Sequence, residues 1–338
     1  MKLLISAAEP SGDRLAADLV RALRERFPDL EALGLAGQAM RAAGVEAVAE
    51  GERLAVMGLV EVLGVVPEAL RIRDALVDRF DGVELVVVVD APDFNIPLAR
   101  KARERGLPVV FYVSPQVWAW RKSRAAEIAE LASVVVCLLP FEPQFYPPGK
   151  AVFLGHPVAE RIAHAGPLGK DLAILPGSRA GEVDRLLEDL VEAAGHTGLN
   201  TRLPRAPGVT LPELPGIEVV EDIASAAGPA KAALTASGTA SLELACLGRP
   251  MVVCYRVNPV TYGLGKLLVT GVEHMALPNL ILGRRAVPEL LQHFGPADLV
   301  ESLEGVASQL ADLEEVRSRL RGAGATDRIA DRIAEVLG

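Results

Sequence analysis

The sequence predicts an α/β protein with two domains, each built on a doubly wound parallel sheet. Short apolar runs alternate with helical patterns along most of the chain, which is typical of strands covered by helices. The alternation stops at the polar stretch 160–171 and then starts again. The chain has 338 residues, and this length favours two domains. We expect a first domain over 1–162 and a second over 170–322, although one large domain also fits the pattern.

Composition excludes several functional classes. The net charge of −9 argues against a general nucleic-acid binder, which needs a basic face for phosphates. The three cysteines form no CxxC pair and no ligand spacing with the five histidines, so we expect reduced thiols. No apolar stretch reaches the roughly 18–20 residues that span a bilayer. Any membrane contact is therefore expected to be peripheral, in a cytoplasmic protein.

The first elements form a strand, a turn and a helix. The apolar residues 3–5 predict a strand, and a helical pattern follows with Ser11 as its expected N-cap. A second strand is expected at 33–36. Residues 57–80 predict one or two helices, broken near Pro67 because proline interrupts helical hydrogen bonding.

A run of four valines at 86–89 predicts the central strand, buried on both faces. Asp90 follows directly, and Pro92 prevents the strand from continuing. Ligands of open α/β sheets bind outside the carboxyl ends of the strands, where Asp90 and Asp93 would lie. Asp90 is therefore a candidate general base for a hydroxyl nucleophile. The alternative is that Asp90 only caps the turn and that Asp93 is solvated.

The remaining elements continue the alternation. Further strands are expected at 109–113, 134–139, 152–154, 172–175, 217–220, 232–235 and 251–255. Residues 195–216, rich in glycine and proline, are expected to be irregular. After Pro288 we expect only helices, and the last stretch, 327–337, is amphipathic.

Gly177, Ser178 and Arg179 form a turn between an expected strand and an expected helix. Backbone N–H groups at a helix N-terminus attract anions, and arginine presents two parallel donors to phosphate. The turn is a candidate phosphate site, but a plain turn with a surface arginine fits equally well.

Ser237, Gly238 and Thr239 form a second turn of this kind before another expected helix. Glu243 lies four residues beyond Thr239, on the same helical face. Its carboxylate can accept hydrogen bonds from a ribose, as acidic residues do in dinucleotide-binding folds. A capping motif with a solvated glutamate is the alternative.

Other residues are weaker candidates. Glu9 lies in the first turn, and His156 follows an expected strand, where a structural role is more common. Trp118 and Trp120 could form a sugar-stacking wall or simply pack. The chain has neither a P-loop motif nor a GxGxxG motif, so ATP and NAD have no support as ligands.

Longer motifs contain many of these residues. They are LAVMG at 54–58, VEVLG at 60–64, DAPDFN at 90–95, YVSP at 112–115, VWAWR at 117–121, LPFE at 139–142, LPGSR at 175–179, ASGTA at 236–240 and LPNL at 277–280. In these motifs the chain resembles bacterial lipid-A-disaccharide synthases, inverting glycosyltransferases with the two-Rossmann-domain GT-B fold. The resemblance extends from residue 5 to about residue 292, and again near the C-terminus.

The resemblance implies a reaction. The donor would be UDP-2,3-diacylglucosamine, the acceptor 2,3-diacylglucosamine 1-phosphate (lipid X), and the products the β-1,6-linked disaccharide and UDP. It assigns catalytic roles to Asp90 as the base, to Arg179 and to Glu9. The residues expected to bind substrate are Ser11, Gly12, Asp93, Asn95, Trp118, Gly177, Ser178, Ser237, Gly238, Thr239, Glu243, Arg256 and Asn279.

The resemblance also implies an enzyme without a metal or cofactor, bound peripherally to the cytoplasmic face of the inner membrane. Residues 57–66, near Arg71 and Arg73, could contact acyl chains or anionic lipid, or could form an ordinary core helix. The family includes dimers that exchange C-terminal segments. We therefore expect helix 323–338 to pack on the first domain or to exchange in a homodimer.

The chain departs from the family pattern in two places. Ala8 and Pro10 replace a glycine and an alanine in the first motif, and the stretch 192–232 is shorter. The sequence also allows two other functions. One is another UDP-sugar enzyme on the same fold, such as an epimerase or a transferase with a non-lipid acceptor. The other is a non-catalytic module that binds UDP-sugar or lipid.

Overall fold

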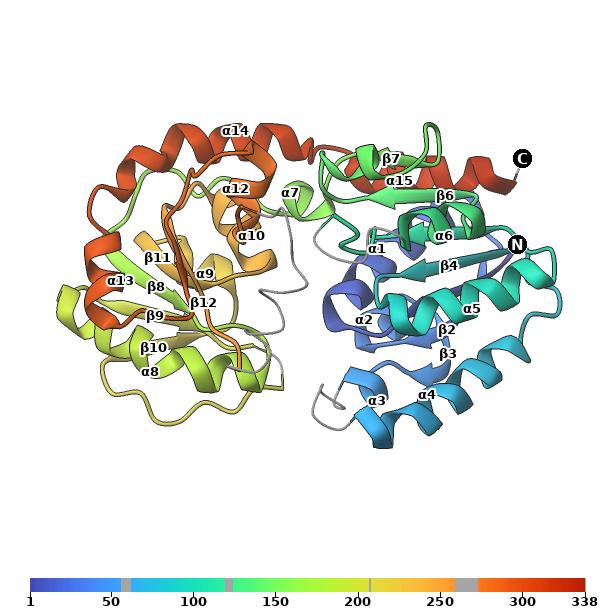
Figure 1. The fold of residues 1–338 in the computed structure, drawn as a ribbon, viewed down its shortest axis with the longest axis horizontal. Helices are drawn as coiled ribbons and strands as arrows, with labels where there is room; N and C mark the ends of the chain where they lie inside the picture. The colour runs from blue at the N-terminus through green and yellow to red at the C-terminus, as the bar shows by residue number, and fades with distance from the viewer. Residues whose placement is uncertain (56–61, 119–123, 207, 259–272, 338) are drawn as a thin grey trace. The chain divides into compact units, whose positions relative to one another are not determined.

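The computed structural model describes residues 1–55, 62–118, 124–206, 208–258 and 273–337. The chain divides into two compact units, which are described separately. Unit 1 comprises Met1–Pro157 and Gly324–Gly338, and unit 2 comprises Val158–Ala323. Each unit contains one parallel sheet with helices on both sides (Figure 1). The fold class predicted from the sequence is confirmed.

The sheet of unit 1 has seven parallel strands in the order β3-β2-β1-β4-β5-β6-β7. The strands are β1 (Lys2–Ala7), β2 (Glu31–Ala36), β3 (Glu46–Glu50), β4 (Leu85–Val89), β5 (Val109–Tyr112), β6 (Val134–Cys137) and β7 (Ala151–Phe153). The strand order reverses between β1 and β4, which pair with Ala7 opposite Val89. A reversal of this kind leaves a crevice beyond the strand ends, where ligands of such folds bind.

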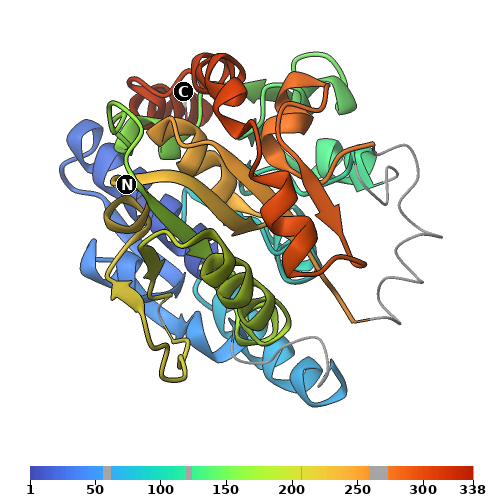
Figure 2. The same ribbon diagram turned by 90° about the vertical axis from the view of Figure 1, so that its left-hand side faces the viewer.

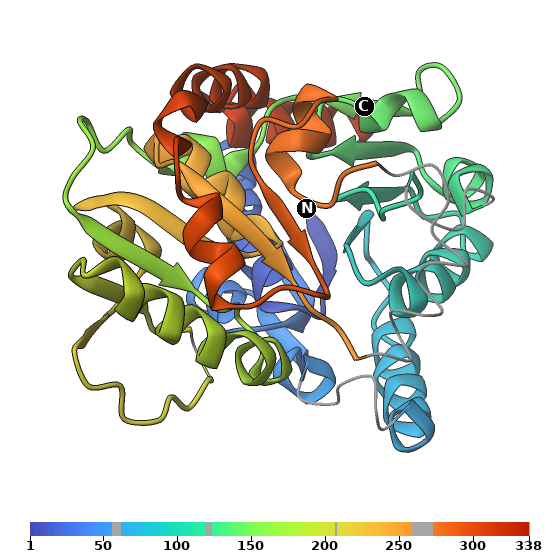
Figure 3. The same cartoon turned by 60° about the vertical axis from the view of Figure 1, so that its left-hand side comes forward.

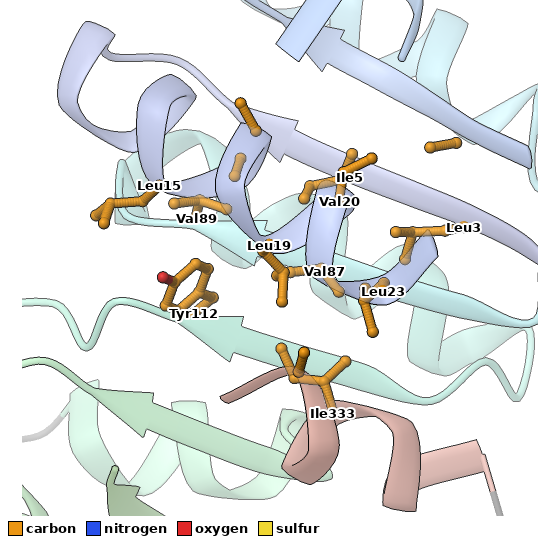
Figure 4. Packing of buried hydrophobic residues seen from close by; sticks show 14 of the residues in the cluster. Leu3, Ile5, Leu15, Leu19, Val20, Leu23, Val87, Val89, Tyr112 and Ile333 are labelled. Atoms are coloured by element: carbon orange, nitrogen blue, oxygen red, sulfur yellow. The ribbon is translucent and has the colours of Figure 1, made fainter. Parts of the chain in front are cut away.

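Helices cover both faces of this sheet. They are α1 (Pro10–Arg26), α2 (Gln38–Ala42), α3 (Glu52–Ala55), α4 (Val62–Val77), α5 (Pro92–Glu104), α6 (Arg124–Leu131), η1 (Glu142–Phe145), α15 (Ala325–Ala334) and η3 (Glu335–Leu337). Helices α1 and α15 pack on one face, and α4, α5 and α6 pack on the other. Figure 4 shows Leu19 and Leu23 of α1 close to Val87 of β4 and Ile333 of α15.

The C-terminal helix α15 belongs to unit 1. Arg26 of α1 donates a hydrogen bond to Asp331 at 2.6 Å and another to the Asp327 carboxylate at 3.3 Å. Ile329 and Ile333 are completely buried in the same core as α1. In this single chain the segment therefore packs on the sheet of unit 1.

Unit 2 has six parallel strands in the order β10-β9-β8-β11-β12-β13. They are β8 (Asp171–Leu175), β9 (Thr201–Pro204), β10 (Ile217–Val220), β11 (Ala230–Ala236), β12 (Met251–Tyr255) and β13 (Glu289–Leu291). The helices are α7 (Pro157–Arg161), which crosses the unit boundary, α8 (Ala180–Thr197), α9 (Ile223–Ala227), α10 (Thr239–Leu247), α12 (Leu277–Leu282), α13 (Pro296–Ser302), η2 (Val306–Gln309) and α14 (Leu310–Leu320). Helices α8 and α13 lie side by side on one face, while α10 packs with α9, α12 and α14 (Figures 2 and 3).

Several local expectations were wrong. Helix α1 begins at Pro10 with Glu9 as its N-cap, two residues before the expected cap at Ser11, because proline suits the first helical position. Pro67 lies inside α4 and does not break it. Burial of Ile72 and Leu76 against the sheet stabilises this helix despite the missing N–H.

Three strands were missed: β3, β9 and β13. Strand β9 lies within the stretch 195–216 that was expected to be irregular, and only Thr201 and Leu203 are buried in it. Strand β13 follows Pro288, where only helices were expected, and has three residues. Both are too short to show a clear alternation of polar and apolar residues.

Candidate functional site

Asp90 directly follows β4, at the carboxyl edge of the unit 1 sheet. Asp90 and Ala91 both have positive φ values, 50° and 43°, in a region that residues other than glycine rarely adopt. The Asp90 N–H donates to the carbonyl oxygen of Tyr112 at 3.3 Å, which ties the turn to strand β5. Backbone strain of this kind is common at functional sites, where the surrounding structure maintains it.

Asn95 holds this turn from within. Its Nδ2 donates to the carbonyl oxygens of Asp90 at 2.8 Å and Val89 at 3.1 Å, and its Oδ1 accepts from Ser6 Oγ at 2.8 Å. The side chain is completely buried. Asn95 therefore fixes the backbone of the Asp90 turn, and its amide bonds in this structure are made within the chain.

Asp93, the other aspartate of this motif, lies in the first turn of α5. Its side chain is 74% exposed and forms an ion pair with Arg124. The two aspartates therefore have different environments, since Asp90 is half-buried and held by its neighbours.

The first turn of the chain lies beside the Asp90 turn. Because Ala7 pairs with Val89, the residues that follow them, Glu9 and Asp90, emerge at the same edge of adjacent strands. Glu9 is the half-buried N-cap of α1, and Ser11 is also half-buried. Gly12 is buried, and a Cβ on it would lie 3.3 Å from a Val89 methyl group. Glycine thus allows α1 to approach β4 closely.

Glu142 was not expected to have a role of its own, yet its carboxyl group is buried near this edge of the sheet. It is 3% exposed, and its Oε2 accepts from the N–H groups of Leu138 at 3.1 Å and Leu139 at 2.9 Å. Burial raises the pKa of Glu142 to about 7, the two backbone bonds oppose that rise, and the negative charge of Asp90 adds a smaller increase to the pKa. A lone glutamate in a sequence gives no sign of such burial.

Trp118 lies beside Glu142. It is 9% exposed and packs edge-to-face on Phe141, with the ring centroids 5.4 Å apart. Its Nε1 is buried and makes no hydrogen bond to the described residues, although the indole N–H is near enough to Glu142 to lower that carboxyl's pKa somewhat. Trp118 is therefore mainly a packing residue here, and Trp120 lies outside the described residues.

In unit 2, the turn at 177–179 connects β8 to α8 as expected. Glu182, in the first turn of α8, folds back over it. Its Oε2 accepts from the Ser178 N–H at 3.1 Å, and its Oε1 accepts from Arg179 Nη1 at 3.3 Å. A Cβ on Gly177 would lie 2.5 Å from this carboxylate, so glycine is needed at this position. A side-chain anion thus already lies where the turn was expected to bind one.

The turn at 237–239 connects β11 to α10. Ser237 Oγ donates to the carbonyl oxygen of Met275 at 3.0 Å. Gly238 has a φ of 156°, and a Cβ on it would meet no described atom within 4 Å, so its backbone faces open space. Thr239 is exposed and Glu243 is half-buried on the same helix.

The two turns of unit 2 are neighbours, because β8 and β11 pair with Leu175 opposite Thr235. Tyr255 ends the adjacent strand β12. Burial raises the pKa of Tyr255, Glu182 raises it further, and the positive charges of Arg179 and Arg185 lower it. Tyr255 is therefore within electrostatic range of the 177–179 turn, which its place in an apolar strand did not indicate.

Asn279 and Arg256 have structural partners. Asn279 is completely buried; its Oδ1 accepts from the N–H groups of Ala286 at 2.7 Å and Val287 at 2.8 Å, and its Nδ2 donates to the Val287 carbonyl at 2.9 Å. The bonds of the Asn279 amide in this structure are therefore made within the chain. Arg256 forms an ion pair with Asp189, so its charge is already compensated.

Within the described ranges, no group of three or more His, Cys, Asp or Glu side chains could hold a metal ion. Among the helices of the described residues, none has the length and apolarity needed to cross a bilayer.

A family model described as lipid-A-disaccharide synthetase matches residues 3–200 and 213–319. The chain belongs to this family. Its relatives include the lipid-A-disaccharide synthase of Myxococcus xanthus, which is 39% identical over 99% of this chain and 97% of the relative. The synthase of Neisseria meningitidis serogroup A is also 39% identical, over 93% of this chain and 88% of the relative. The resemblance found in the sequence is confirmed.

Solved structures agree on the fold of this lipid-A-disaccharide synthase family member. The glycosyltransferase of kitacinnamycin superposes with a TM-score of 0.70 at 17% identity, covering 100% of this chain and 99% of that one. MurG of Acinetobacter baumannii gives 0.61 at 15% identity, with 99% of both chains covered. A UDP-GlcNAc 2-epimerase of Methanocaldococcus jannaschii gives 0.63 at 11% identity, covering 99% of this chain and 100% of that one. At such identities the likeness shows the fold alone.

Proposed function

We propose that this chain joins UDP-2,3-diacylglucosamine to 2,3-diacylglucosamine 1-phosphate, giving the β-1,6-linked disaccharide 1-phosphate of lipid A and UDP. The observation that carries the proposal is the family match over residues 3–200 and 213–319, together with relatives named lipid-A-disaccharide synthase at 39% identity over nearly the whole chain. Epimerases share the fold at 11–12% identity, which does not favour their reaction here.

The reaction is a direct displacement at the anomeric carbon of the donor. Asp90 takes the proton from the 6-hydroxyl of the acceptor, the freed oxygen bonds to the anomeric carbon, and the bond to UDP breaks with inversion. The position of Asp90 at the end of β4, in a turn held by Asn95, supports this role. Glu9, on the adjacent strand end, is assigned to the acceptor side of the same site.

Unit 2 is proposed to bind the donor. Arg179 stabilises the negative charge that develops on the departing diphosphate. The N–H groups of the 177–179 turn and of Gly238 and Thr239 bind phosphate oxygens, since the Ser237 N–H already donates to the Cys254 carbonyl at 3.0 Å. Glu243 accepts from the ribose hydroxyls. For a phosphate to reach the Ser178 N–H, the carboxylate of Glu182 moves aside, because one donor cannot serve both anions fully.

Peripheral contact with inner-membrane lipid, from the cytoplasmic side, is part of the proposal. Leu70 and Arg71 of α4 are exposed, which suits a helix that meets an anionic lipid surface. Homodimer formation, as in some family members, is proposed as well.

The deciding experiment incubates the full chain with both acylated sugars and looks for the disaccharide by mass spectrometry. Asp90→Asn and Arg179→Ala are expected to fold normally and to lose product. Asp81→Asn and Arg21→Ala change exposed residues of the same types and serve as matched controls. Absence of disaccharide from the unaltered chain would refute the reaction, and unchanged turnover in either site variant would refute that residue's role. An unacylated UDP-sugar, tested in parallel, distinguishes an epimerase.

A further inference from the structure

Glu289, the first residue of β13, anchors the segment that reaches the 237–239 turn. Its Oε2 accepts from the Met275 N–H at 2.9 Å, and its Oε1 accepts from the Ala276 N–H at 3.1 Å. Asn279 Nδ2 also donates to Oε1. The Glu289 side chain is only 18% exposed, and His274 Nδ1 lies 3.7 Å from the same oxygen. One largely buried carboxylate therefore fixes both backbone amides before α12.

The other side of Met275 meets the donor turn. Its carbonyl oxygen accepts from Ser237 Oγ at 3.0 Å. Met275 is thus held at its N–H by Glu289 and at its carbonyl by Ser237. Because the hydroxyl proton is used by Met275, Ser237 Oγ offers lone pairs to a ligand. It suits a hydroxyl or N–H donor of the nucleotide better than a phosphate oxygen.

We propose that Glu289 is a positioning residue of the donor site, which fixes Ser237 and the 237–239 turn through Met275 and thereby sets the affinity for the UDP part of the donor. The inference rests on the proposed function for its ligand. Asn279 helps to position Glu289, because its amide forms hydrogen bonds both with the Glu289 carboxylate and with the backbone at 286–287.

The chemistry of the side chain makes a sharp test possible. Glu289→Gln keeps the size but replaces one acceptor oxygen by an NH2 group, which cannot accept from the N–H groups that both oxygens now serve. Losing a hydrogen bond to a buried group costs free energy. If that cost appears in UDP binding, the affinity for UDP falls roughly tenfold. Glu304→Gln, at an exposed position of unit 2, is the matched control.

UDP binding to the full chain is measured by calorimetry, and the KM values for donor and acceptor are measured separately. In Glu289→Gln the dissociation constant of UDP and the KM of the donor are expected to rise roughly tenfold, with the KM of the acceptor unchanged. Ser237→Ala tests whether the effect passes through Ser237. In a chain that already carries Ser237→Ala, Glu289→Gln should weaken UDP binding much less, because the linked hydroxyl is already gone.

Unchanged UDP affinity in a folded Glu289→Gln variant would overturn the inference, and so would effects of the two substitutions that add fully. A fall in melting temperature with unaltered UDP affinity would show a purely structural role and would overturn it too. Because UDP binding needs no acceptor, the result is separate from the product assay. If the unaltered chain binds UDP but makes no disaccharide, the proposed function fails while this inference can still hold.

Discussion

Replacing Glu142 by glutamine should change how the stability of unit 1 depends on pH. Glu142 is the buried first residue of η1, and its Oε2 accepts from the backbone N–H groups of Leu138 and Leu139, which directly follow β6. A glutamine carbonyl oxygen in the same place can accept both bonds, so the substitution removes the titration and preserves the packing.

The sign and size follow from the pKa. Burial raises the pKa of Glu142 from 4.5 to about 7 in the folded state. Between these values the folded protein holds a proton that the unfolded chain has lost, so the free energy of unfolding falls as pH rises. Below pH 4.5 the carboxyl is protonated in both states, so it does not lower the free energy of unfolding. Above pH 7 it is ionised in both states, and the loss of unfolding free energy is complete. The difference in pKa corresponds to about 3 kcal/mol, an upper value because the group can relax.

Tryptophan fluorescence reports this unit alone, since both tryptophans lie within Met1–Pro157. Denaturant unfolding is measured at pH 5 and pH 8 for the unaltered chain and for Glu142→Gln. From pH 5 to pH 8, the free energy of unfolding of Glu142→Gln should rise by roughly 2–3 kcal/mol relative to that of the unaltered chain. Glu130→Gln, at an exposed position of α6, should show no such gain. If the two chains differ in unfolding free energy by the same amount at pH 5 and at pH 8, the Glu142 pKa is not raised and the reasoning is wrong.

Three further substitutions test buried contacts within the two units. Asp13 accepts from the N–H groups of 37, 39 and 40, so Asp13→Asn should lower the unfolding free energy of unit 1 by about 1–3 kcal/mol in the fluorescence assay; no change would contradict this. Arg249 is completely buried and donates hydrogen bonds to carbonyl oxygens at 165–167 and 227–228. Arg249→Met should lower the free energy of unfolding by at least about 3 kcal/mol and speed proteolysis at 165–168. Equal protease resistance would show that Arg249 does not hold this segment. A Cβ on Gly34 would lie 1.8 Å from the Ile5 carbonyl oxygen, so Gly34→Ala should give little folded protein by circular dichroism, and a native spectrum would contradict the clash.

The buried parts of the fold could be predicted from sequence, and the edges could not. All five residues of β4 are buried, so its apolar run was unambiguous. Strand β3 at the sheet edge has no buried residue, and its pattern EAVAE resembles a surface segment. Edge strands bury little apolar surface, and their residues therefore carry little information about the sheet they join.

The turns of the candidate site could be located from the sequence, but the contacts of each side chain could not. The end of β4 and the glycine turns after β8 and β11 were identified because strand ends and turn residues leave local signals. The partners of those turns are distant in sequence: Ser6 meets Asn95 across 89 residues, and Ser237 meets Met275 across 38. No local pattern reveals such contacts.

Asn95 and Asn279 show what this means for the interpretation of motifs. Both lie in motifs that resemble the family's, and both were expected to contact substrate. In each, the amide is completely buried and is used by the chain itself, by the Asp90 turn in one case and by Glu289 and the 286–287 backbone in the other. A side chain that fixes a catalytic turn is as sensitive to substitution as one that touches the ligand, because a small displacement of the reacting group slows the reaction. Loss of activity on substitution therefore does not distinguish the two roles; separate measurements of ligand affinity and turnover do.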